Sequence, residues 1–294
     1  MQAATGSARW LSLAVWYASL PGVSVDDLAG SVAEAGAGQR PGVFAYAALV
    51  LGPCELVEDC SWEHRTSTVF RLRDARGTVW FLKRHRERER YLAELSAYRR
   101  WVPALGATAP CLRASDDVLQ AMILSALPGE PAPWPDPGDG PPSAQRAAEA
   151  AIQREAGALL RRFHDAQPAL LWNDFGHAKL DEFDRLAHCA AGLVTPAELA
   201  SARAEVETLA GAGYPVRVPC HRDYTPRNWL LSAGTVRVVD FEWCRLDVWV
   251  SDLARLHIGV WERRPDLQDA FLHGYGRELV VRSRGSARRR TKWR

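Results

Sequence analysis

The sequence predicts an α+β protein of two lobes, a small lobe built on an antiparallel sheet and a larger lobe that is mostly helical. Three observations lead to this bilobal fold class. Residues 68–83 have the pattern of a β-hairpin, seven prolines interrupt the chain at 128–142, and helical periodicity dominates beyond them. Strands and one helix before a break, with helices after it, are typical of an α+β layout rather than of alternating β–α–β units.

The composition is that of a folded chain with an uneven charge. Its 294 residues are 47% hydrophobic and 24% charged, which is enough apolar material for two cores and unlike a disordered chain. Residues 282–294 hold seven basic and no acidic residues, and the remaining 30 basic and 35 acidic residues leave a net charge of −5. We expect the basic tail to be disordered and solvated and to have no nucleic-acid partner; nucleic-acid binding through this tail is the alternative.

The cysteines and the early apolar segment predict a cytoplasmic protein without a membrane partner. None of the six cysteines forms a Cys-x-x-Cys pair, so we expect reduced thiols. The apolar run at 10–20 ends at Pro21-Gly22 and is too short to span a bilayer; a secretory signal is the alternative.

The smaller lobe is expected at 53–127, after an N-terminal extension (1–52) to which the sequence assigns no role. Within the extension, 43–51 is apolar enough to be a buried strand or helix. The hairpin at 68–83 turns at Asp74-Ala-Arg-Gly77. Leu92, Leu95 and Tyr98 then recur at helical spacing, and 118–124 resembles a buried strand.

The larger lobe is expected at 128–281. Ser143 is positioned to cap a long helix with an apolar stripe, and further helical patterns fill 181–212. Two short apolar strands, 229–231 and 236–239, flank a Ser-Ala-Gly turn, and helical periodicity resumes after Asp252.

The residues with catalytic potential lie in the larger lobe. The loop Cys220-His-Arg-Asp-Tyr-Thr-Pro-Arg-Asn228 precedes a hairpin that ends in Asp240-Phe-Glu242. The loop can turn Asp223 and Asn228 toward one point, and the hairpin delivers Asp240 to the rim of its sheet. The Asn228 amide and the Asp240 carboxylate offer the oxygen ligands that Mg²⁺ prefers, which leaves Asp223 to accept a hydroxyl proton. Turn capping is the alternative role for Asp223 or Asn228 taken singly.

Lysine is rare in this chain, and one lysine ends an apolar strand. Only three of the 37 basic residues are lysine, and Lys83 closes the run Val79-Trp-Phe-Leu-Lys83. A position that needs only positive charge would be expected to hold arginine here, so Lys83 is a candidate functional residue; a solvated strand end is the alternative.

These paired motifs resemble the protein-kinase-like superfamily, whose signature is H-x-D-x-x-x-x-N with a second acidic motif downstream. The sequence is most similar to the aminoglycoside phosphotransferase and choline kinase family, in which that second motif is D-x-[DE], here Asp240-Phe-Glu242. The resemblance spans about 60–275. It implies a bilobal protein-kinase-like fold and an O-phosphotransferase that uses ATP and Mg²⁺ on a hydroxyl of a small molecule.

The resemblance also implies roles at matching positions in the larger lobe. Asp223 would be the catalytic base, and Asn228 and Asp240 would be the Mg²⁺ ligands. His221 would be a scaffold histidine, and Asp252 would brace the catalytic loop. Glu242 is either a second metal-adjacent acid or a supporting residue.

In the smaller lobe the resemblance implies a nucleotide site. Lys83 would bind the phosphates and pair with Glu94, with Glu87 and Glu89 as rival partners. Other contacts to ATP would come from hydroxyl and backbone groups, at Ser67, Thr68, Ser125 and Leu127. The loop at 62–68 contains no glycine, which leaves open a catalytically idle, nucleotide-binding relative.

The acceptor is predicted less sharply. Residues 173–215, which would line its pocket in this family, hold seven acidic and three basic residues, a net of −4. That charge suits a cationic acceptor such as an aminoglycoside or amino alcohol; an ordinary solvated helix face is the alternative. Sugars, homoserine and macrolide-like alcohols also remain open.

Overall fold

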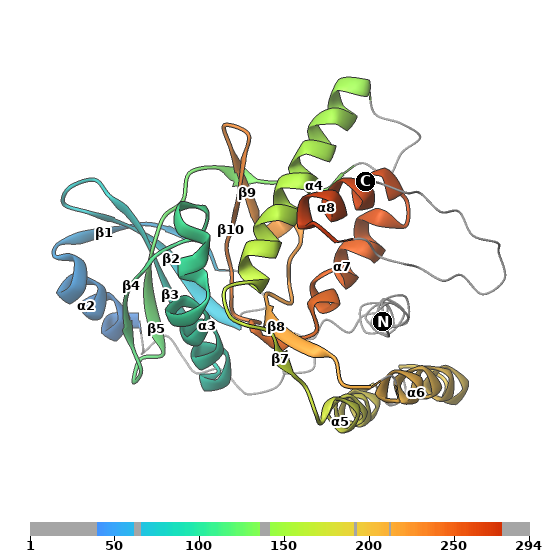
Figure 1. Ribbon diagram of the computed structural model, residues 1–294. Coiled ribbons are helices and arrows are strands. Elements are labelled where there is room, and N and C mark those ends of the chain that lie inside the picture. The colour runs from blue at the N-terminus through green and yellow to red at the C-terminus, as the bar shows by residue number, and fades with distance from the viewer. Residues whose placement is uncertain (1–39, 62–65, 136–141, 191–192, 212, 278–294) are drawn as a thin grey trace.

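The computed structural model describes residues 40–61, 66–135, 142–190, 193–211 and 213–277. They form the two predicted lobes, a sheet-based lobe and a mostly helical one (Figure 1). The predicted basic tail at 282–294, most of the N-terminal extension and loop residues 62–65 lie outside the described residues.

The small lobe is a five-stranded antiparallel sheet with strand order β1-β2-β3-β5-β4. The hairpin predicted at 68–83 is confirmed, because β2 and β3 pair in register with Val69 opposite Lys83. Its turn is closed by Asp74, whose Oδ1 accepts hydrogen bonds from the backbone N–H groups of Arg76 and Thr78. The strands are β1 (Cys54–Asp59), β2 (Ser67–Asp74), β3 (Val79–His85), β4 (Leu112–Asp116) and β5 (Ala121–Ser125).

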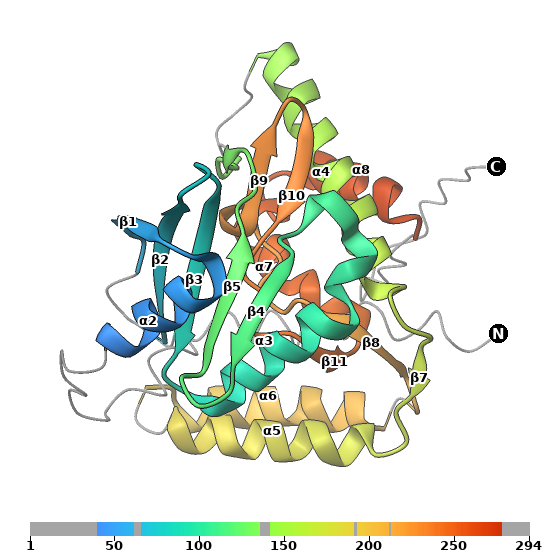
Figure 2. The ribbon, with the colours of Figure 1, turned by 90° about the vertical axis from the view of Figure 1, so that its left-hand side faces the viewer.

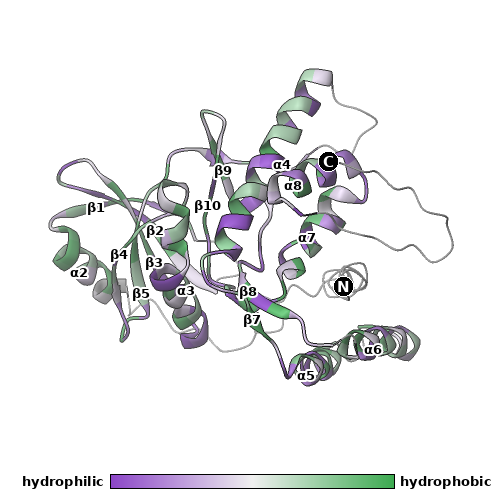
Figure 3. Cartoon of the chain, in the orientation of Figure 1, coloured by the Kyte–Doolittle hydropathy of each residue, from purple (hydrophilic) through white to green (hydrophobic). Residues whose placement is uncertain are grey.

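Helices cover both faces of this sheet (Figure 1). Helix α2 (Arg40–Leu51) packs Val43 and Ala47 against Phe70 and Leu82 on one face. Helix α3 (Arg88–Arg100) lies on the other face, which carries Lys83. The apolar segment expected at 43–51 is therefore a helix whose buried side belongs to the core of the small lobe, and Figure 3 shows its apolar colouring.

The larger lobe is centred on helix α4 (Ser143–His164) and helix α8 (Pro265–Tyr275), which pack against each other. Helices α5 (Phe175–Cys189) and α6 (Pro196–Ala210) lie side by side along one end of the molecule, as Figure 2 shows. The expected cap of α4 is wrong in detail: Pro142 occupies the N-cap position and Ser143 is already helical. Proline fits there because its fixed φ and missing N–H do not interfere with helix initiation.

Two three-stranded sheets in the larger lobe hold the loops that carry the candidate catalytic residues. One has the order β10-β9-β6 and the other β11-β8-β7. The predicted hairpin at 229–239 is confirmed as β9 and β10. The bounds are β6 (Glu130–Pro131), β7 (Leu170–Leu171), β8 (Val216–Cys220), β9 (Trp229–Ser232), β10 (Thr235–Val238) and β11 (Arg245–Asp247).

Short helical segments complete the two lobes. They are the 3₁₀ turns Val102–Thr108, Pro226–Asn228 and Trp249–Asp252, helix α7 (Ala254–Leu256) and the π-helical turn His257–Trp261. Within the described parts of the chain, no helix combines the length and the apolar character needed to cross a membrane.

Glycine allows α4 and α8 to approach closely. A Cβ added at Gly157 would collide with the backbone carbonyl of Phe271 on α8. Gly157→Ala should therefore destabilise the protein, although alanine favours a helix by itself, because backbone atoms on both helices would have to separate. We expect the free energy of unfolding to fall by about 1–3 kcal/mol, measured by denaturant melts.

The matched control is Ala158→Ser, which adds one atom at the exposed neighbouring position. It should change the free energy of unfolding by less than about 0.5 kcal/mol. Equal stability of Gly157→Ala and the unmodified protein would show that the two helices are not in close contact.

Candidate active site

Lys83 connects the two lobes through three carboxylates. Its Nζ lies 2.9 Å from Glu94 Oε2 on α3, 2.6 Å from Asp240 Oδ1 and 3.1 Å from Glu242 Oε2. Lys83 is buried, so it is not a solvated strand end. Glu94 is thus its partner on α3, and Glu87 instead lies near Arg90.

The pKa values in this cluster follow from burial and charge together. Burial would lower the pKa of Lys83, but Asp240, Glu94 and Glu242 raise it well above its ordinary value. Burial would raise the pKa of Glu94, but Lys83 and the hydrogen bond from His85 lower it to about 2. Burial raises the pKa of Glu242, with Lys83 opposing the shift and Asp240 adding to it. Burial is thus the main reason that the pKa of Glu242 is raised, and repulsion by Asp240 and Glu94 adds to it.

The cluster has the charge and the chemistry to hold a divalent metal ion. Three carboxylate side chains surround one ammonium group in a largely buried site. Glu94 Oε1 is buried without a hydrogen-bond partner. Carboxylate oxygens are hard ligands, which Mg²⁺ prefers, so Asp240 and Glu242 fit this ion.

The candidate catalytic loop follows β8 and is held by one buried carboxylate, Asp252. The Asp252 Oδ2 accepts hydrogen bonds from the His221 N–H at 2.9 Å and from His164 Nε2 at 2.8 Å. Its Oδ1 accepts from the Arg222 N–H, where the backbone adopts a left-handed φ of 67°. The two loop amides that approach Asp252 are adjacent in sequence, so one side chain fixes the entry into the loop.

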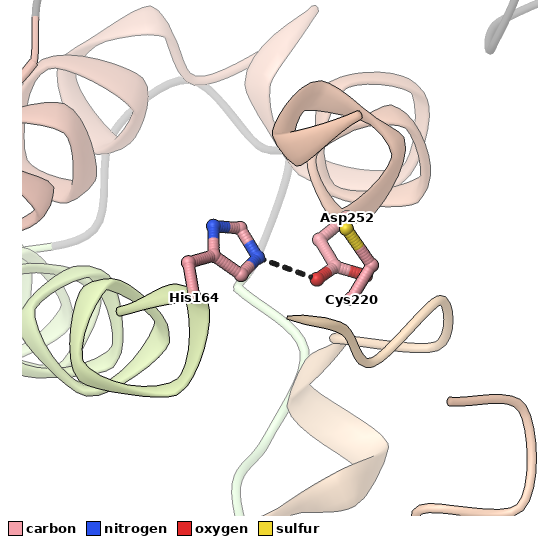
Figure 4. Close-up of side chains that lie close together, drawn as sticks. All are labelled: His164, Cys220 and Asp252. Carbon is pink, nitrogen blue, oxygen red and sulfur yellow. Dashed lines mark hydrogen bonds and ion pairs between the residues drawn. The ribbon is translucent and has the colours of Figure 1, made fainter. Parts of the chain in front are cut away.

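Figure 4 shows His164 and Asp252 beside the thiol of Cys220. These three could in principle hold a metal, but each already has partners in the protein. His164 Nδ1 lies 2.6 Å from the Tyr275 hydroxyl, and the Cys220 thiol lies 3.4 Å from the Val248 carbonyl. Burial also raises the pKa of Cys220 well above its ordinary value, which disfavours a thiolate ligand. We interpret the cluster as a brace for the loop.

His221 links the loop to the end of β10. Its Nε2 donates to the Val239 carbonyl at 3.1 Å, and its Nδ1 accepts the Asp223 N–H at 3.3 Å. The Val239 N–H in turn donates to the Asn228 carbonyl at 3.0 Å. Asp240 follows with a left-handed φ of 67°. The loop and the strand end that carry the candidate residues are therefore connected at several points.

Asp223 and Asn228 are brought together, as the sequence predicts. Asn228 Nδ2 donates to Asp223 Oδ2 at 2.8 Å and to the Asp223 carbonyl at 2.9 Å. With its amide nitrogen used in this way, Asn228 has its Oδ1 as the oxygen for a metal ion. Sequence reasoning missed two arginines here: Arg227 donates to Asp223 Oδ2, and Arg255 Nη1 donates to Oδ1 at 2.8 Å.

The two hydroxyls predicted to contact phosphate lie on opposite faces of β2. Ser67 pairs with His85 and shares the face of Lys83, and its Oγ lies 3.5 Å from Glu242 Oε2. Thr68 pairs with Arg84 and faces the other way, because successive side chains of a strand alternate. Thr68 is therefore not brought to the cluster. Thr66, which the sequence analysis did not select, places Oγ1 3.4 Å from Glu242 Oε1.

The predicted adenine linker follows β5. The Ser125 N–H already donates to the Cys111 carbonyl, and the Ala126 N–H donates to the Val79 carbonyl. The Leu127 N–H has no backbone partner among the described residues. A backbone donor to a nucleotide would therefore come from Leu127, whereas the backbone of Ser125 offers only its carbonyl oxygen and its hydroxyl already accepts from the Cys111 N–H.

The acidic residues of 173–215 are largely paired within the protein. Asp184 and Glu207 lie 2.6 and 3.2 Å from Arg203. Glu198 completes the capping box of α6 with Thr195, and Glu182 pairs with Lys179 and Arg245. Lys179 and Arg203 are already counted in the net charge of −4, and Arg245 is the one cation from outside the segment in these contacts, so the segment keeps a net negative charge.

The sheet-based lobe, the helical lobe and the Lys83 cluster between them define a protein-kinase-like phosphotransferase. A family model described as "Phosphotransferase enzyme family" matches residues 61–291. The chain belongs to this family, whose members transfer phosphoryl groups to small molecules, and the predicted family resemblance is confirmed.

Solved structures agree on the fold at low sequence identity. Macrolide 2′-phosphotransferase MphH from Brachybacterium faecium is 18% identical with a TM-score of 0.55, over 82% of this chain and 84% of that one. Choline kinase LicA from Streptococcus pneumoniae is 16% identical with a TM-score of 0.57, over 83% and 82%. APH(2″)-IIa, solved with streptomycin and ATP, is 12% identical with a TM-score of 0.55, over 81% and 82%. No curated protein sequence matches the chain.

The brace around Asp252 yields a testable expectation. Asp252→Asn keeps the shape of the side chain but replaces one acceptor oxygen with a donor, which would face backbone N–H groups or His164. We expect a loss of about 1.5–3 kcal/mol of unfolding free energy and a fall in kcat larger than any rise in KM for ATP.

Asp269→Asn, at an exposed position of α8, is the matched control and should leave both properties unchanged. Full stability of Asp252→Asn would mean that the carboxylate does not hold the loop.

Proposed function

We propose that the protein is an O-phosphotransferase that uses ATP and Mg²⁺ to phosphorylate a hydroxyl of a small molecule. The observation that supports this most is the contact of Lys83 with both Glu94 and Asp240, because it joins the candidate phosphate-binding and metal-binding residues of the two lobes. APH(2″)-IIa, a protein of similar fold, has been solved in a complex with streptomycin and ATP.

Each residue has a defined task in this proposal. Asp240, Glu242 and Asn228 Oδ1 would hold Mg²⁺, which neutralises phosphate charge when bound. Lys83, held by Glu94, binds the phosphates from the small lobe. The hydroxyls of Thr66 and Ser67 lie beside Glu242 in the same cluster. Asp223 accepts the hydroxyl proton as the acceptor oxygen bonds to the γ-phosphorus and the bond to the β–γ bridging oxygen breaks, which releases ADP.

A catalytically idle nucleotide-binding protein is the second candidate, because the loop before β2 contains no glycine. The hydroxyls of Thr66 and Ser67 at the cluster favour the active enzyme, since short polar side chains can contact phosphate without a glycine backbone. A cytoplasmic location and the absence of a nucleic-acid partner stay predictions.

The test is a screen for ADP formation with Mg²⁺ and ATP over acidic, neutral and amino-bearing alcohols, with phosphorylated product identified by mass spectrometry. Acceptor-dependent ADP formation with a matching phosphorylated alcohol supports the proposal. Tight binding of ATP with no product from any alcohol would favour the idle relative.

A further inference from the structure

The carboxylate of Asp223 is covered by two arginines. Its side chain is only 2% exposed, whereas the side chains of Arg227 and Arg255, which both contact it, are 45% and 38% exposed. Two partly exposed guanidinium groups therefore lie directly at the buried carboxylate of Asp223.

The hydrogen bonds of Asp223 indicate where a hydroxyl can approach. Oδ2 accepts from Arg227 and from Asn228, which uses both of its lone pairs. Oδ1 accepts from Arg255, so one lone pair of Oδ1 remains for a hydroxyl. The hydroxyl that Asp223 activates would consequently lie beside the Arg255 guanidinium.

The surroundings of the catalytic loop extend this positive charge. Arg222 and Arg245 are 24% and 45% exposed, and both contact the fully buried Asp247. Arg245 and Lys179 also pair with Glu182, whose side chain is largely buried. In these ion pairs the carboxylates are buried, and the more exposed partners are the arginines. The cations in these contacts are Lys179, Arg222, Arg227, Arg245 and Arg255, against Glu182, Asp223, Asp247 and the fully buried Asp252, which accepts from the loop amides.

We propose that the acceptor carries an anionic group, a carboxylate or a phosphate, close to the hydroxyl that is phosphorylated, and that Arg255 binds this group with Arg227 beside it. This inference rests on the proposed function and names the chemical class of its acceptor. A planar guanidinium donates two parallel hydrogen bonds to such an oxyanion, and Arg255, whose side chain is 38% exposed, donates to Asp223 through Nη1. A cationic group would meet like charge at the same place.

The experiment compares acceptors that differ only in charge. A three-carbon set consists of glycerate, glycerol phosphate, glycerol and 2-aminopropanediol, and gluconate, glucitol and glucamine repeat the comparison with longer chains. ADP formation and the phosphorylated product are measured with Mg²⁺ and ATP at constant ionic strength. The variants are Arg255→Gln, Arg255→Lys and Arg154→Gln, the last on the exposed surface of α4.

We expect the anionic members to exceed the neutral and amino members by at least about tenfold in kcat/KM. The ratio of glycerate to glycerol phosphate distinguishes a carboxylate from a phosphate as the bound group. Arg255→Gln should abolish the preference for acids, Arg255→Lys should retain part of it, and Arg154→Gln should leave it intact.

Three outcomes would overturn the inference: a preference for the amines, equal use or no use of all members, or an equal loss of kcat for every acceptor in Arg255→Gln. The last result would place Arg255 at the transferred phosphoryl group. The outcomes in which product forms are distinguishable from failure of the proposed function, because phosphorylated product identifies an active enzyme. No product from any member, with ATP still bound, would overturn the proposed function and this inference together.

Discussion

Asp223→Asn is expected to lower kcat by about 10²–10⁴-fold, the usual contribution of a positioned general base. The amide cannot take the hydroxyl proton, and no other described carboxylate contacts Asn228 and Arg255 in its place. Because the candidate metal oxygens of Asp240 and Asn228 stay, the affinity for ATP with Mg²⁺ should change little. Steady-state kinetics and equilibrium ATP binding measure the two effects.

Asp181→Asn, at an exposed position of α5, is the control for loss of a carboxylate and should behave like the unmodified protein. A thermal melt of Asp223→Asn accompanies the kinetics, since the new amide group would face two arginines. If ATP affinity fell as much as kcat, Asp223 would belong to the metal site and the base would have to be another group.

Lys83→Arg is the second large effect, with an expected loss of at least about tenfold in kcat/KM, or roughly 1.4 kcal/mol of transition-state stabilisation. The buried ammonium lies within 3.1 Å of three carboxylates from both lobes. A guanidinium is wider and planar, so it would have to displace Glu94, Asp240 or the phosphates that Lys83 is proposed to bind.

The reverse substitution Arg71→Lys, on the neighbouring strand β2, is the control. Arg71 is partly exposed, and its ion pair with the exposed Glu58 is long at 3.7 Å, so the exchange should have little effect. Lys179→Arg, the same exchange at another lysine, would be a poor control because Lys179 is itself buried between Glu182 and Asp247. Unchanged kinetics of Lys83→Arg would mean that the lysine is incidental to catalysis.

Features that depend on local sequence could be predicted. Alternation and turn residues placed the hairpins at 68–83 and 229–239, and both are confirmed. The pairing of Lys83 with Glu94 and the contact of Asp223 with Asn228 also appear in the structure. The contact of Asp223 with Asn228 joins positions of one short loop, whereas the pairing of Lys83 on β3 with Glu94 on α3 was implied by the family resemblance.

Features that depend on register or on distant elements could not be predicted. The register in which β2 pairs with β3 decides that Ser67, and not Thr68, lies on the face of the sheet that carries Lys83. Arg255 reaches Asp223 from α7, and no local pattern relates the two. The partners of the acidic residues in 173–215 could not be predicted either, because the pairing of Asp184 and Glu207 with Arg203 depends on how α5 and α6 pack; the acceptor class stays a prediction.

The central claim is that Asp240 helps to hold Mg²⁺ for ATP beside Lys83. It is tested most directly by ATP affinity, measured by calorimetry across a Mg²⁺ titration, for the unmodified protein and for Asp240→Asn. We expect Mg²⁺ to strengthen ATP binding in the unmodified protein and Asp240→Asn to lose most of that gain, while its affinity without Mg²⁺ falls little. The same Mg²⁺ dependence in both proteins would contradict the claim.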